Sequence, residues 1–172
     1  EGVLSQRAML ATEQGKHEEA LEYYNEAVLC SADNASLYLL RGDTYTLLQD
    51  TESAMRNYEI MLGTYEDTPT FATLQGFAYA RMGRNVEAEA WMECVMQGIK
   101  GIPAPEDYYN AACLYAHTGN KARAYYYLEE ALKAGYGDYF NLYFEYDSPT
   151  SLASLRNEPD FRELIRNYSE MF

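Results

Sequence analysis

The chain has 172 residues, of which 48% are hydrophobic and 15% aromatic, and its 13 basic and 27 acidic residues give a formal net charge of −14. This hydrophobic content excludes a disordered chain and suits one domain with a sizeable core. The acidic excess disfavours nucleic acid and anionic membrane surfaces as partners, because both are bound through Lys and Arg. A basic partner would be attracted, although acidity also serves simply to keep a protein in solution. No window approaches the roughly 20 apolar residues of a membrane span.

Helical periodicity and turn residues predict four helical hairpins in the first 134 residues. Pro69 and Pro105 lie at the start of the third and fourth hairpins, where proline is tolerated. The predicted helices cover 2–14, 17–31, 35–48, 51–63, 70–82, 85–98, 105–118 and 121–134.

The turn inside each predicted hairpin repeats one pattern, in which Gly is followed by four residues and then Ala. It occurs at Gly15–Ala20, Gly83–Ala88 and Gly119–Ala124, and Gln49–Ala54 carries Gln in place of Gly. Ala20, Ala54 and Ala88 are 34 residues apart, and Ala124 follows after 36. A fixed period of this length indicates an array of stacked helical hairpins.

Two further motifs recur in the same frame. Gly42-Asp-Thr-Tyr45 and Gly76-Phe-Ala-Tyr79 place a small residue three before a tyrosine, and Ala20 and Ala54 each precede a tyrosine by four residues. This pattern resembles the tetratricopeptide repeat family. The resemblance implies an all-α fold, a right-handed α-α solenoid of four hairpins with a helical C-terminal cap. It covers residues 1–134, with repeats at about 1–34, 35–68, 69–102 and 105–134.

Residues 135–172 break the period and form an aromatic-rich segment. We expect a short helix at 138–146, a turn around 151–156 and a final helix that opens at Pro159 and carries Phe161 and Ile165 on one stripe. A repeat array exposes its last apolar face, so this segment is predicted to be a helical cap. An exposed hydrophobic docking patch within 139–146 is the alternative.

The tetratricopeptide resemblance implies protein binding on the concave side, which the first helix of each hairpin lines. The groove suits an amphipathic helix or an extended peptide with apolar anchors, and Asp43 offers a carboxylate to a partner's Lys or Arg. Packing between helices is an equally open interpretation for Met9 and Leu39. The candidate contact residues are Met9, Leu39, Asp43, Phe77, Arg81, Tyr109, Cys113 and His117, and Arg81 and His117 are expected to reach the rim.

Some members of that family hold a chaperone's C-terminal carboxylate with a clamp of Lys, Asn and Arg side chains. The positions that match this clamp cannot supply the charge-assisted hydrogen bonds it needs. They are Ser5, Met9, Leu40, Thr70 and Leu74. We therefore predict a scaffold or adaptor without a carboxylate clamp.

Tyrosine is unusually abundant, with 18 residues, and three of them are adjacent at Tyr125, Tyr126 and Tyr127. Three consecutive helical residues cannot all face the core, and tyrosine is favoured at protein interfaces. The alternative function is therefore a structural subunit or homo-oligomer that uses a face near 125–146. The simpler interpretation is an amphipathic surface whose tyrosine hydroxyls are hydrated.

Catalytic chemistry is not indicated. His17 and His117 lack motif-spaced partners, and no metal-binding or phosphate-binding motif occurs, so we expect neither an enzyme nor a cofactor. Three cysteines without a CxxC pair predict reduced thiols, which slightly favours the cytoplasm. The sequence begins at Glu1 rather than Met, so an export signal that has been removed is not excluded.

Overall fold

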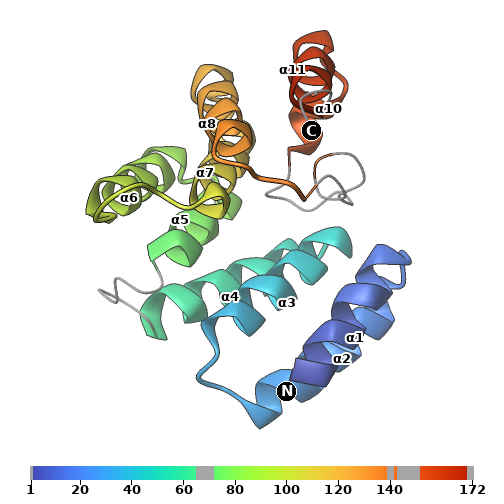
Figure 1. Cartoon of the computed structure of the whole chain (residues 1–172). Helices are drawn as coiled ribbons and strands as arrows, with labels where there is room; N and C mark the ends of the chain where they lie inside the picture. Colours follow the sequence, from blue (N-terminus) through green and yellow to red (C-terminus); the bar gives the residue numbers. More distant parts are fainter. Residues whose placement is uncertain (1, 65–71, 139–141, 143–151, 170–172) are drawn as a thin grey trace. The chain divides into compact units, whose positions relative to one another are not determined.

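The computed structural model describes residues 2–64, 72–138, 142 and 152–169, and throughout these ranges the regular structure is α-helical, with no strand. The chain divides into two compact units, Glu1–Met82 and Gly83–Phe172. Each unit is built from helices that follow one another in the chain and pack side by side (Figure 1). The predicted all-α array of helical hairpins is confirmed.

Among the described residues of unit 1 there are five helices. α1 pairs with α2, α2 packs on α3, α3 pairs with α4, and α4 packs on α5 (Figure 1). Within residues 2–64 the predicted helix limits agree with the structure to within one residue. The helices are α1 (Gly2–Glu13), α2 (His17–Cys30), α3 (Ala35–Leu47), α4 (Thr51–Thr64) and α5 (Ala72–Arg81).

The repeated turn has one backbone conformation. Gly15, Gly83 and Gly119 have φ angles of 72°, 73° and 83°, and Gln49 adopts φ 61° at the corresponding place. Glycine enters this left-handed region without steric cost, whereas a residue with a Cβ is strained there. The sequence period thus reflects a turn that favours glycine.

The two helices of the second hairpin approach each other at Gly42. A Cβ added there would lie 2.8 Å from Cδ1 of Tyr58, and Tyr58 itself is 1% exposed. The first hairpin likewise has alanine at its interior positions, because Ala8, Ala20 and Ala27 are 0% exposed. Small residues at these sites therefore allow close contact between helices.

Unit 2 also contains five helices among the residues that the structure describes. α7 and α8 form a hairpin, α6 packs on α7, and the C-terminal helices α10 and α11 contact α7 and α8 respectively (Figure 1). Pro105 is the first residue of α7, and the N–H of Ala104 donates to Oδ2 of Asp107 at 2.9 Å. The helices are α6 (Asn85–Gly98), α7 (Pro105–His117), α8 (Lys121–Lys133), α10 (Ala153–Arg156) and α11 (Pro159–Ser169).

The final helix covers α8, as expected of a cap. Phe161 and Ile165 of α11 are 2% and 0% exposed. The Tyr168 hydroxyl donates to Glu129 of α8 at 3.4 Å. Of the helix predicted at 138–146, only Asp138 and Leu142 belong to the described residues, and the N–H of Leu142 donates to the carbonyl of Asp138 at 3.2 Å. The domain limit at residue 134 stays a prediction.

Candidate functional site

Three of the candidate binding residues meet in unit 1. The Nε of Arg81 donates to Oδ1 of Asp43, and its Nη2 donates to Oδ2 at 2.6 Å, so α5 is joined to α3 by a bidentate ion pair. The guanidinium carbon of Arg81 also lies 5.5 Å from the ring centre of Phe77. The side chains of Arg81 and Asp43 are only 5% and 10% exposed. We expected Arg81 at the rim of a groove, but the Asp43 carboxylate holds it inside unit 1.

The same carboxylate has a third donor. The hydroxyl of Tyr58, on α4, donates to Oδ1 of Asp43 at 3.0 Å and lies 3.0 Å from the Oγ1 of Thr46. Burial, and then the negative charge of Asp43, raise the pKa of Tyr58 well above its usual value. The sequence suggested Asp43 as an anchor for a partner's basic side chain. In the structure its carboxylate is bound to Arg81 and Tyr58, which links α3, α4 and α5.

The other candidate residues of unit 1 differ in exposure. Leu39, one helical turn before Asp43, is 4% exposed, and Phe77 is 9% exposed. Met9 on α1 is 40% exposed. Of the two residues for which packing was an equally open interpretation, Leu39 is therefore a core residue and Met9 offers apolar surface to solvent.

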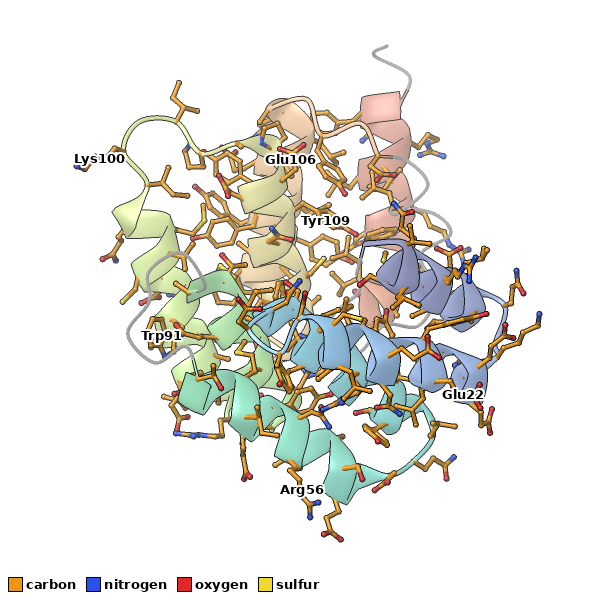
Figure 2. All side chains as sticks on the ribbon, turned by 90° about the horizontal axis from the view of Figure 1, so that it is seen from below. Glu22, Arg56, Trp91, Lys100, Glu106 and Tyr109 are labelled. Atoms are coloured by element: carbon orange, nitrogen blue, oxygen red, sulfur yellow. The ribbon has the colours of Figure 1, made fainter. Side chains whose placement is uncertain are left out.

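In unit 2 the three candidates lie on α7. The ring of Tyr109 stacks on Tyr136, with centroids 4.3 Å apart and planes 8° apart, and Figure 2 shows Tyr109 pointing among other side chains. Tyr109 and Cys113 are 7% and 3% exposed, whereas His117 at the end of α7 is exposed. Lys100, in the connection before α7, points away from the helices (Figure 2). Of the three candidates, only His117 is open to direct contact.

The consecutive tyrosines of α8 have three different environments. Tyr125 donates to Glu158 at 2.9 Å, Tyr127 stacks on the buried Tyr115 with centroids 5.4 Å apart, and Tyr126 is 58% exposed. Burial raises the pKa of both stacked phenols, Tyr115 and Tyr127. The expectation that the three cannot all face the core is confirmed.

An open cleft of about 390 Å³ lies beside these rings, between α6 and α8. Arg123 lines it, forms an ion pair with Glu93 and donates to the Tyr115 hydroxyl at 2.9 Å. Sequence reasoning identified the tyrosines but missed the cleft, because residues of α6 complete it. Its lining residues are Glu93, Met96, Gln97, Arg123, Tyr126 and Tyr127.

The described residues hold no group of three or more His, Cys, Asp or Glu side chains that is close enough to bind a metal ion. None of the described helices is both long and apolar enough to span a membrane. Cys30 and Cys94 are exposed free thiols, and Cys113 is a buried one.

Comparison with known proteins agrees with the geometry. Residues 2–34, which form α1, α2 and the turn that follows, match a family model described as Tetratricopeptide repeat. Residues 2–34 therefore form a tetratricopeptide repeat. This repeat is a protein-interaction unit, and its presence supports a protein–protein interaction role.

Two curated relatives match larger parts of the chain. A chloroplastic protein of Arabidopsis thaliana is 33% identical over 102 residues, which are 57% of this chain and 28% of that protein. A Small glutamine-rich tetratricopeptide repeat-containing protein of Dictyostelium discoideum is 39% identical over 70 residues, or 41% of this chain and 19% of that protein. The chain therefore spans less than a third of the length of either relative.

Proposed function

We propose that the chain is a scaffold or adaptor whose tetratricopeptide repeats bind a peptide or protein segment on the side lined by the first helix of each hairpin, without a carboxylate clamp. The observation that carries this proposal is the regular stacking of α1 to α5 in unit 1, together with the family match over residues 2–34. Helical repeats of this kind create extended surfaces for other chains.

The exposed candidates are the ones proposed to touch the partner. Met9 in unit 1 offers an apolar side chain, and His117 in unit 2 offers an imidazole. Within unit 1, the buried Asp43–Arg81 pair holds α3 and α5 together. The net charge of −14 favours a partner with basic residues beside its apolar anchor.

Quantitative affinity capture tests the proposal. The intact chain, a Met9→Glu variant and a His117→Glu variant are each immobilised, with Val86→Glu as the control, because Val86 is 83% exposed on α6. We expect specific partners to be depleted about tenfold by Met9→Glu or His117→Glu and retained by Val86→Glu. Partners that all variants retain equally would contradict the assignment to the first-helix side. Helicity of each variant is checked by circular dichroism.

The second candidate function is assembly of a homo-oligomer through the tyrosine-rich face. It is favoured by one observation, namely the 58% exposed ring of Tyr126 beside the open cleft between α6 and α8. Tyrosine rings next to a cleft are typical of protein interfaces, since the ring buries area while the hydroxyl stays hydrated. Light scattering over a range of concentrations checks this. A dimer that Tyr126→Lys dissociates would support it, and a monomer at every concentration would contradict it.

A further inference from the structure

The open cleft of unit 2 lies between the second helices of two hairpins, α6 and α8, which both pack on α7 (Figure 1). Its volume of about 390 Å³ falls within the range of roughly 300–1,000 Å³ that is typical of ligand pockets. Both walls come from helices in the interior of the array, so neither end of the chain creates the cleft. The chemistry of the lining indicates which ligand would fit.

Two tyrosine rings form much of the α8 wall. Tyr126 and Tyr127 both line the cleft, with ring centroids 5.1 Å apart and planes at 74° to each other. Tyr127 is held in place by stacking on the buried Tyr115, whereas Tyr126 is 58% exposed. Nearly perpendicular rings surround a ligand on two sides, and each phenol adds a hydroxyl that can donate a hydrogen bond. The wall therefore combines apolar ring surface with donors.

The polar part of the lining is also rich in hydrogen-bond donors. Arg123 contacts Glu93 and the Tyr115 hydroxyl with the same nitrogen, Nη1, and its side chain is 45% exposed. The other guanidinium donors can therefore serve a ligand, and the exposed Gln97 adds a side-chain amide. Glu93 balances the charge of Arg123, so the lining has no net charge. A neutral ligand with many acceptors fits this lining best.

Few kinds of protein segment meet this requirement. A charged side chain would meet a like charge on Glu93 or on Arg123. An α-helix is about 10–12 Å wide and uses its main-chain carbonyls internally, so it would leave the donors of the cleft without acceptors. A segment in the polyproline II conformation has free carbonyls, and its prolines have no N–H group that would need an acceptor. Such a segment is both apolar and rich in acceptors.

From this complementarity we propose that the cleft between α6 and α8 binds a proline-rich segment of a partner protein in the polyproline II conformation. Its prolines pack on the rings of Tyr126 and Tyr127, and its carbonyls accept hydrogen bonds from the Tyr126 hydroxyl, Gln97 and Arg123. The preformed extended conformation lowers the entropy that binding costs. The site lies on second helices and does not depend on the proposed first-helix side. A second copy of the chain is a poorer occupant, because each copy carries a net charge of −14.

The probe for the test is a peptide of nine prolines with blocked ends, which is uncharged. It is titrated into the isotope-labelled chain, and amide chemical shifts report binding even at millimolar affinity. We expect the shifts to cluster at residues 93–97 and 123–127. A control peptide has its three central prolines replaced by D-proline, which keeps the composition but disrupts the polyproline II conformation, and it should bind about tenfold more weakly. An uncharged alanine-rich helical peptide tests the alternative of a docked helix.

Variants of the chain locate the contact. Tyr126→Ala removes an exposed ring from the cleft and should weaken binding of the proline peptide about tenfold. Tyr126→Phe keeps the ring and Gln97→Leu removes only an amide, so each should weaken binding about threefold through the loss of one hydrogen bond. Tyr23→Ala is the matched control, because Tyr23 is a half-buried tyrosine of α2, and binding should change less than about twofold. Circular dichroism verifies that each variant keeps its helicity.

Absence of any shift at millimolar peptide would overturn the proposal. Shifts confined to α1, α3, α5 or α7 would also overturn it, while supporting the first-helix side as a peptide site. Equal binding of the D-proline or the helical peptide would show that the polyproline II conformation is not what the cleft recognises. A dimer of the intact chain that Tyr126→Ala dissociates would identify a second copy as the occupant and overturn the assignment to a proline-rich segment.

Discussion

Arg81 binds the carboxylate of Asp43, which lies 38 residues earlier in the sequence, with two nitrogens of its guanidinium. Both side chains are almost fully buried, and the Tyr58 hydroxyl donates to the same carboxylate. A buried ion pair needs such additional hydrogen bonds to offset the desolvation of its charges. This contact therefore joins α5 to α3 and α4.

Removing one partner of this pair is expected to be costly. Arg81→Met leaves the Asp43 carboxylate buried without its cation, so the free energy of unfolding should fall by roughly 3–5 kcal/mol. Adding Asp43→Asn should restore part of the loss, and urea unfolding measures both variants. Arg56→Met is the control, because Arg56 and Glu52 form an ion pair whose side chains are 67% and 85% exposed, so its loss should cost less than about 1 kcal/mol. Similar losses for Arg81→Met and Arg56→Met would show that burial of the Asp43 pair is unimportant.

Gly42→Ala should destabilise unit 1 by about 1–3 kcal/mol, because the added methyl group overlaps the Tyr58 ring and the surrounding helices are closely packed. Gly63→Ala is the matched control in α4, where nothing lies within 4 Å of the new Cβ. That change should be neutral or up to about 1 kcal/mol stabilising, since alanine favours a helix more than glycine. Thermal unfolding distinguishes the two variants. A stabilised Gly42→Ala protein would contradict the close approach of α3 and α4.

Gln49→Gly should stabilise the second hairpin by about 0.5–1 kcal/mol. Gln49 has φ 61°, which strains a residue with a Cβ, and relief of that strain exceeds the greater freedom that glycine gives the unfolded chain. The reverse change at the corresponding turn of unit 2, Gly119→Ala, should cost about 1 kcal/mol or more. No atom lies within 4 Å of a Cβ at Gly119, so its effect reports the backbone alone. Chemical unfolding would contradict the explanation if both changes had the same sign.

Unit 2 should lose stability as the pH rises above about 10. Burial and the hydrogen bond to Glu158 raise the pKa of Tyr125 to about 12, whereas an unfolded tyrosine titrates near 10. Between these values the unfolded state releases the proton first, so the free energy of unfolding falls with rising pH. Tyr125→Phe should make this decline shallower between pH 10 and 12, as measured by unfolding at each pH. Tyr126→Phe changes an exposed ring and serves as the control, which should follow the unmodified protein.

The sequence by itself determined the helices and their repeat. The turn glycine and the alanine five residues after it recur with a period near 34, and so does the small residue found at Gly42 in the second hairpin. They recur because each hairpin repeats the same tight turn and the same close contact between its helices. These local requirements fixed the helix limits to within one residue in seven of eight cases and identified the final helix at Pro159. The same local patterns predicted the all-α fold, because backbone preferences and helical spacing can be recognised in a single sequence.

Only the tertiary structure decided which candidate residues remain available to a partner. Periodicity places Asp43 and Arg81 on corresponding sides of their helices, but it cannot show that they bind each other, since that contact depends on the distance between α3 and α5. The cleft beside Tyr126 likewise depends on which helices lie next to each other. The exposure of a side chain depends on the residues packed around it, and contacts between residues far apart in the sequence are decided by the packing of the helices.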